Sequence, residues 1–129
     1  MAPSPNTTAP KIVEVPNVQM IDIVLQSLDD AKAEATVAID ITGKSPLSDH
    51  MVVTSGRSNR HVSAVADQVV RALREAGFGK PRVEGLPHAD WVLVDAGDVI
   101  VHIFRPEVRE FYNIEKMWAA PDLDEGTIH

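Results

Sequence analysis

The sequence predicts one α/β domain, built on a mixed sheet of about five strands with two main helices on one face. Its 129 residues and 14.1 kDa suit a single hydrophobic core. Short runs rich in valine and isoleucine alternate with two long stretches of helical period, which is typical of strands covered by helices. The last two apolar runs are separated by four residues, close enough to pair as a terminal hairpin.

The amino-terminal part of the chain changes character at Asn17. Residues 1–16 hold four of the nine prolines and show no apolar period, so we expect a disordered arm. From Val18 to about Ala33 apolar residues recur at helical spacing, and Asn17 suits the N-cap of this helix. Alternation over residues 36–41 then predicts the first strand.

A second strand, over residues 50–55, leads into the longer of the two helices. Apolar residues keep helical spacing from Val62 to Ala76, Ser58 suits the N-cap, and Gly77 is expected to end the helix. The Gly/Ser turn before this helix could cradle an anion. A capped helix with solvated arginines is the interpretation that we favour.

A hairpin is predicted from Trp91 to Phe104, after a short strand near residues 82–85. Both sets of alternating side chains are largely apolar, whereas a hairpin with one wet face alternates apolar and polar residues. The second face is therefore either covered by another layer or exposed for another protein. A two-residue loop groups Trp91 with His102, and a bulged turn groups it with Val101.

A short helix is predicted from Pro106 to Tyr112. Proline suits the first helical turn, and Glu107 places a negative charge at the positive end of the helix. The residues that follow are expected to form a last turn or a short strand that packs Trp118 on the body. The predicted organisation is a disordered Pro-rich arm over residues 1–16, a folded α/β domain over residues 17–118 and a flexible acidic tail over residues 119–129.

The net charge of −7 lies entirely in the carboxyl-terminal part of the chain. Residues 1–83 carry nine Lys/Arg and nine Asp/Glu, whereas residues 84–129 carry three and ten. Such a surface repels nucleic acid, which proteins bind by neutralising phosphates, so we expect no sequence-specific nucleic-acid binding. It attracts a basic protein to the hairpin side. Acidic surfaces also serve solubility alone, and charge does not decide between these two interpretations.

No catalytic or metal-binding constellation stands out. The chain has no cysteine, and its five histidines include no pair at ligand spacing on one element, so we expect neither a metal nor a cofactor. The alternative function is that of a nucleotidyltransferase-fold enzyme acting on a nucleotide, which requires two metal-binding acids one residue apart on a strand. Asp95 and Asp98 are three apart across a turn, so we do not expect an enzyme.

The composition is that of an ordinary globular chain, with 44% hydrophobic and 24% charged residues. No apolar run approaches the length of about 18 residues that suggests a membrane span. The amino terminus lacks the basic and then apolar pattern of a signal peptide. We therefore expect a cytoplasmic protein that does not engage membranes.

The stretch from Gly85 to Trp118 carries a long and specific motif. Its central part reads W-V-L-V-D-x-G-D-V-I-V-H-I-F-x-P-E-V-R-E-F-Y and is followed by Glu-Lys-x-Trp. This string closely resembles the ribosomal silencing factor (Iojap-like) family. Shorter matches lie upstream at residues 40–45 and 58–62, so the resemblance covers residues 17–118 in a single register.

The resemblance implies a binding protein without enzymatic activity. Members of that family bind the large ribosomal subunit through ribosomal protein fourteen of that subunit and keep the small subunit from joining. An uncovered apolar hairpin face further predicts a homodimer in the free state. Aromatic residues would serve as anchors and acidic ones as pairs for a basic partner. The contacts suggested by the match are Trp91, Asp95, Asp98, His102, Phe104, Glu107, Arg109 and Tyr112.

Overall fold

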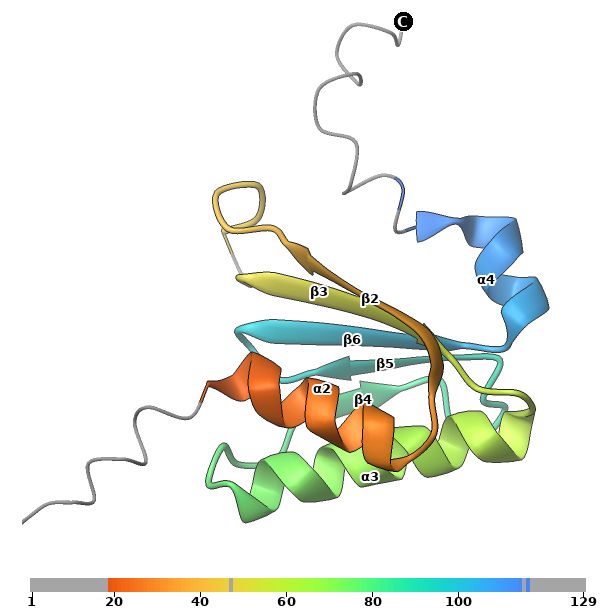
Figure 1. Cartoon of the computed structure of the whole chain (residues 1–129), viewed down its shortest axis with the longest axis horizontal. Coiled ribbons are helices and arrows are strands. Elements are labelled where there is room, and N and C mark those ends of the chain that lie inside the picture. Colours follow the sequence, from red (N-terminus) through yellow and green to blue (C-terminus); the bar gives the residue numbers. More distant parts are fainter. Residues whose placement is uncertain (1–18, 47, 115, 117–129) are drawn as a thin grey trace, which may run out of the picture.

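A five-stranded mixed sheet forms the centre of the fold (Figure 1), which confirms the predicted class. The computed structural model describes residues 19–46, 48–114 and 116; the predicted arm and tail, Asn17 and Trp118 lie outside this part. The strand order is β2-β3-β6-β5-β4; of the four strand pairs in this order, β3–β6 is parallel and the other three are antiparallel. The elements are α2 (Met20–Asp30), β2 (Glu34–Asp40), β3 (His50–Ser55), α3 (Asn59–Glu75), β4 (Arg82–Glu84), β5 (Trp91–Asp95), β6 (Val99–Phe104) and α4 (Pro106–Tyr112).

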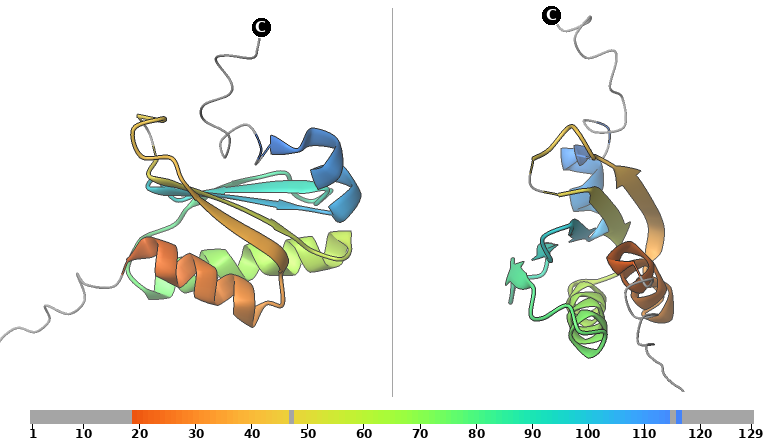
Figure 2. Two further views of the ribbon diagram at one scale, coloured as in Figure 1. Left: turned by 45° about the horizontal axis from the view of Figure 1, so that its top comes forward. Right: turned by 90° about the vertical axis from the view of Figure 1, so that its left-hand side faces the viewer.

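Helices α2 and α3 pack together against one face of the sheet (Figure 2). Their apolar stripes follow from the helical period of the sequence, and they bury aliphatic side chains against the strands. Within the described part of the chain, no helix has the length and apolar character needed to cross a membrane. The main core between helices and sheet includes Val24, Leu28, Val65, Val69, Leu73, Val92, Val101 and Ile103.

The helix ends differ slightly from the prediction for α2 and agree with it for α3. Helix α2 begins at Met20 after Gln19, which makes no side-chain cap bond, so the predicted cap at Asn17 is wrong. It ends before Ala33, because Lys32 adopts a left-handed φ of 64° and closes a Schellman motif. Helix α3 ends in the same motif at Gly77, whose φ is 90°.

Helix α4 lies on the sheet face opposite to α2 and α3 (Figure 2). Pro106 lacks the N–H that would continue a strand and starts this helix, so the chain turns back over the end of β6. Side chains of Val108 and Ile114 pack there on a second buried cluster. The expectation that this face is poorly covered is therefore wrong at the α4 end. The second cluster consists of Ile39, Ile41, Met51, Val53 and Phe104.

Candidate functional site

The register of the β5–β6 hairpin decides which side chains share the second face. Trp91 pairs with Phe104, and a two-residue loop joins the strands, with Gly97 at a φ of 93°. Directly opposed and alternate residues point to the same face of a sheet. Trp91, His102 and Phe104 therefore lie together, as predicted for the two-residue loop, and the bulged grouping with Val101 is excluded.

Five rings form an aromatic cluster between the sheet and α4. The Trp91 ring centroid lies 4.8 Å from that of Phe104, 4.8 Å from that of Tyr112 and 5.8 Å from that of His102. Phe111 joins through an edge-on contact with Tyr112 at 5.0 Å. Exposure rises outward, from 0% for Phe104 to 51% for Tyr112 and 80% for Phe111. The aromatic cluster therefore connects the core directly to the surface.

A groove of about 480 Å³ lies between Trp91 and α4. Its apolar walls come from Trp91, Val108, Phe111 and Tyr112, and two carboxylates complete the lining. Protein interfaces are enriched in aromatic residues at their centre and carry polar residues at their rim, and this groove has the same arrangement. We call the groove together with the aromatic cluster the aromatic surface; the two carboxylates, of Asp90 and Glu107, form its acidic rim.

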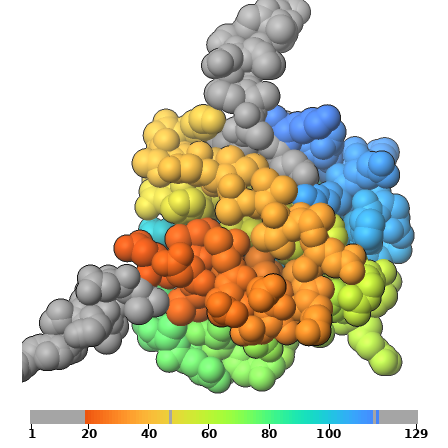
Figure 3. Space-filling model, in the orientation of Figure 1, coloured from red at the N-terminus to blue at the C-terminus, as the bar shows by residue number. Residues whose placement is uncertain are grey.

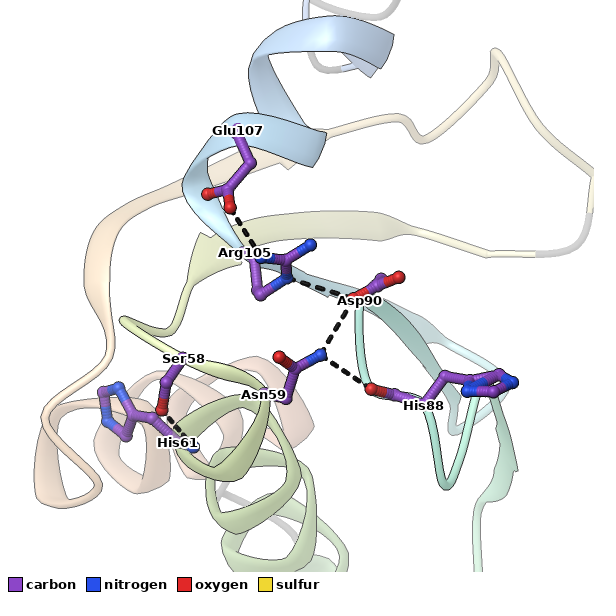
Figure 4. Close-up of polar contacts among 7 residues, drawn as sticks. All are labelled: Ser58, Asn59, His61, His88, Asp90, Arg105 and Glu107. Atoms are coloured by element: carbon purple, nitrogen blue, oxygen red, sulfur yellow. Dashed lines mark hydrogen bonds and ion pairs between the residues drawn. The ribbon is translucent and has the colours of Figure 1, made fainter.

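The acidic rim is held in place by a network around Arg105 (Figure 4). Arg105 donates from Nε to Asp90 Oδ1 at 3.0 Å and from Nη1 to Glu107 Oε2 at 2.6 Å. Asn59 donates to the same Asp90 oxygen at 2.8 Å and to the His88 carbonyl at 2.7 Å. The Asn59 hydrogen bond, assisted by the Arg105 charge, lowers the pKa of Asp90. Two carboxylates against one guanidinium leave a net negative charge at the rim.

Trp91 and His102 are joined by a direct hydrogen bond. The indole Nε1–H of Trp91 donates to His102 Nδ1 at 3.0 Å. Burial lowers the pKa of His102 to about 4, because a charged ring would lose its hydration there. The His102 ring is consequently neutral at neutral pH, which suits its place within an apolar surface.

Arg109, another predicted contact, holds α4 against the sheet. Its Nη1 donates to the Ala35 carbonyl at 2.7 Å and to Ser55 Oγ at 2.9 Å. These bonds link the helix to β2 and β3, on the side of α4 away from Trp91. The guanidinium therefore acts within the chain, where it fixes the position of the helix.

Asp95, the last residue of β5, and Asp98, in the loop, lie at the other end of the hairpin. Asp95 faces Arg82, with 3.4 Å between the charged groups, and accepts a hydrogen bond from Gly97 N–H at 3.0 Å. The backbone carbonyl of Asp98 accepts from Asp49 N–H at 2.8 Å. The structure thus separates these two acids from the aromatic surface and gives them local roles in the turn.

Phe111 and Asp90 belong to the site but were not among the predicted contacts. A signal for Phe111 was present: α4 has only seven residues, yet it carries Val108, Phe111 and Tyr112. So short a helix cannot bury three large apolar side chains against the end of a sheet, and none of its residues is buried. Asp90 gave no such signal, because its role depends on the distant Asn59 and Arg105.

The Gly/Ser turn before α3 is explained by the fold. Ser58 Oγ accepts a hydrogen bond from His61 N–H at 3.1 Å, which caps the helix as the favoured interpretation predicted. A Cβ on Gly56 would come within 2.9 Å of the Val62 nitrogen, so the close approach of strand and helix requires glycine. Among the described residues, no group of three or more His, Cys, Asp or Glu is placed to hold a metal ion.

Comparison with known proteins decides the family. The sequence model of RsfS, described as ribosomal silencing factor during starvation, matches residues 14–128. The chain belongs to the ribosomal silencing factor family. This confirms the resemblance seen in the motif from Gly85 to Trp118, and it does not favour the nucleotidyltransferase alternative.

Individual members of the ribosomal silencing factor family are similar over most of the chain. The factor of Zymomonas mobilis is 43% identical over 120 residues, which are 93% of this chain and 90% of that protein. The factor of Bacillus subtilis is 39% identical over 110 residues, 83% of this chain and 93% of that protein. A crystal structure from Chromobacterium violaceum, 39% identical, superposes with a TM-score of 0.75 and covers 77% of this chain and 82% of that one.

Proposed function

We propose that this protein binds the large ribosomal subunit in the cytoplasm, through ribosomal protein fourteen of that subunit, and sterically blocks joining of the small subunit. Translation is repressed as a result. The observation that carries the proposal is the aromatic surface with its acidic rim beside α4. Aromatic anchors supply much of the binding energy of protein interfaces, and a negative rim steers a basic partner. Membership of the ribosomal silencing factor family supports the ribosome as that partner.

The residues predicted from the motif divide into roles under this proposal. Phe104, which is fully buried, supports Trp91 from within, and Arg109 fixes α4. Asp95 and Asp98 lie at the turn and would meet only a partner that extends along the hairpin. The proposed direct contacts are Trp91, His102, Glu107 and Tyr112, to which we add Phe111.

Sedimentation with separated subunits tests the proposal. We expect the purified protein to co-sediment with large subunits and not with small ones, and to reduce reassociation when it is added before the two are mixed. Recovery with small subunits alone, or with neither subunit, would refute the proposed function.

Charge reversal at Glu107 tests which face docks. We expect Glu107→Lys to lose blocking activity, because a positive rim repels a basic partner and exposed charges act over about 8–10 Å at ordinary salt. The fold should lose only about 1 kcal/mol, since Glu107 gives up an exposed ion pair and a helix-dipole contact. Glu75→Lys, a reversal at the end of α3 on the helix side, is the matched control and should block normally. Full blocking by a folded Glu107→Lys protein would remove α4 from the interface.

We also infer that the free protein forms a homodimer through the same surface, because Phe111 and Tyr112 leave apolar rings exposed. Light scattering at several concentrations should show a species of about twice the chain mass of 14.1 kDa. Phe111→Ser should shift it towards the monomer. A monomer at every concentration would contradict the inference without affecting the proposed ribosome binding.

A further inference from the structure

Within the part of the chain that the structure describes, His61 and His102 both accept a hydrogen bond at Nδ1. His61 Nδ1 accepts from the backbone N–H of Arg57 at 2.9 Å, and His102 Nδ1 accepts from the indole N–H of Trp91 at 3.0 Å. Backbone amides and indoles can only donate, so neither Nδ1 carries a proton. In a neutral imidazole the proton must then reside on Nε2. Both rings are therefore held as the Nε2–H tautomer.

The two Nε2–H groups differ in what they meet. His61 Nε2 lies 2.9 Å from the Ala31 carbonyl, which accepts its hydrogen and ties α3 to the end of α2. For His102 Nε2 the described residues provide no acceptor. Both ring nitrogens of His61 thus form hydrogen bonds within the fold, whereas for His102 only Nδ1 does so among the described residues.

The two strand neighbours of His102 and the stacked Phe104 ring offer no acceptor. In the sheet His102 pairs with Leu93 of β5 and Val53 of β3, both apolar. The Phe104 ring stacks beside it with centroids 6.1 Å apart and planes at 13°. The His102 side chain is half-buried on the second face of the sheet.

We propose that Trp91 and His102 form a directional recognition pair, in which the Trp91 indole fixes the His102 tautomer and His102 Nε2–H is a donor that the partner must meet with a hydrogen-bond acceptor. The inference rests on the proposed function for the existence of the partner. A main-chain carbonyl or a side-chain oxygen fits the position. Trp91 acts here as a positioning residue for His102, in addition to being an apolar anchor.

The pair makes the aromatic surface selective in a way that shape alone does not. In the free protein water can satisfy the Nε2–H of this half-buried residue, but docking excludes that water. A partner without an acceptor then leaves a desolvated donor unpaired, which weakens binding about tenfold to a hundredfold. A lysine or arginine head is rejected at this point, because it too can only donate. The surface consequently accepts a cation at its acidic rim and an acceptor at its centre.

Nuclear magnetic resonance of the free, full-length chain tests the tautomer. With nitrogen-15 histidine, long-range proton–nitrogen spectra should show an unprotonated Nδ1 and a protonated Nε2 for both His61 and His102; His102→Gln assigns the signals. Trp91→Phe keeps a ring but removes the donor, so the pKa of His102 should rise, while the tautomer of His61 stays the same. A proton on His102 Nδ1 in the wild type would overturn the proposal, as would an unshifted His102 pKa in Trp91→Phe.

Binding of three His102 variants to isolated large subunits tests the acceptor. His102→Gln keeps an amide N–H donor near the position of Nε2, whereas His102→Leu has similar bulk and no donor; His102→Met is a second variant of this kind. We expect the Leu and Met variants to bind about tenfold to a hundredfold more weakly, and Gln to bind close to wild type. The proposal of an acceptor on the partner would be overturned if the Leu variant bound as tightly as wild type, or if the Gln variant lost as much affinity as the Leu variant. A wild type that binds no subunit refutes the proposed function and the acceptor together, while the tautomer is decided by the free-protein spectra.

Discussion

The two faces of the sheet are closed by different means. The helix face is covered by the 11 residues of α2 and the 17 of α3, and its core is aliphatic. The other face has the seven-residue α4 at one end, where its side chains are aromatic. Aliphatic side chains have no polar atom and favour complete closure, whereas Trp, Tyr and His combine an apolar body with a polar tip. Graded burial on the second face therefore yields a surface that is anchored in the core and still presents aromatic rings to solvent.

The helix layer and the aromatic surface also lie apart in space. In the space-filling view α4, in blue, occupies a corner of the molecule, away from α2 in red and orange (Figure 3). A partner can reach this corner without displacing the helix layer. Substitutions of buried residues on either face should accordingly lower stability, whereas substitutions of exposed rings on the second face should lower docking, and the following four predictions test that division.

The largest effect is expected for Phe104→Ala, which should lower the free energy of unfolding by about 3–5 kcal/mol, because a fully buried ring leaves a cavity. Leu73→Ala on the helix face is the matched case, at about 2–5 kcal/mol. Urea denaturation measures both. A loss below about 1 kcal/mol for Phe104→Ala would mean that the second cluster adds little to stability.

The next effect depends on pH. Folding keeps the His102 pKa at about 4 against an ordinary value of 6.5, so the unfolded chain binds the proton first as the pH falls. This contribution, on the order of 3 kcal/mol, is present above pH 6.5 and is lost as the pH drops towards 4. Unfolding free energies of wild type and His102→Gln at pH 7 and pH 5 should therefore converge at the lower pH. Parallel losses in the two proteins would contradict the assignment to His102.

Arg109→Met should cost about 1.5–3 kcal/mol, because it removes charged hydrogen bonds to Ala35 and Ser55 that hold α4. Arg71→Met on α3 removes an exposed pair with Asp67 and should cost only about 0.3–0.5 kcal/mol. Thermal melts of the two variants provide the comparison. Similar costs would mean that α4 is held by its apolar contacts alone.

The smallest effect on folding is expected for Phe111→Ser, since the side chain is 80% exposed and surface changes usually stay within about 0.5 kcal/mol. Its binding to large subunits should nevertheless fall by at least about tenfold if it is an anchor. Phe78→Ser, at the opposite end of the sheet near the start of α2, is the control and should bind normally. Equal binding by the two variants would remove Phe111 from the interface.

Most of the fold follows from local patterns. Valine and isoleucine runs, the proline at the start of α4 and the glycine that ends α3 act within a few residues, so strands, hairpin and helices could be predicted. The hairpin register could not be predicted, because Gly97 suits both a two-residue loop and a bulged turn. The N-cap was placed at Asn17 because its residue type suits a cap, but the helix starts after Gln19.

The site was less accessible to such reasoning, because its geometry comes from contacts distant in sequence. Trp91, His102 and Tyr112 could be singled out by the motif. The hydrogen bond from Arg109 to Ala35 joins residues 74 positions apart, and no local sequence pattern predicts it. The burial of Phe104 likewise depends on where α4 folds back, which its seven residues do not specify.

The parallel pairing of β3 with β6 has a consequence for the order of events during synthesis. Residues 50–55 can complete their side of the sheet only when residues 99–104 have been made. Contacts so far apart in sequence form late, because a long loop must be closed first. Helix α4 follows β6 directly, so a nascent chain lacks the whole aromatic surface until nearly all of the domain has left the ribosome that makes it. The aromatic surface, and with it the proposed docking site, is therefore among the last parts of the domain to form.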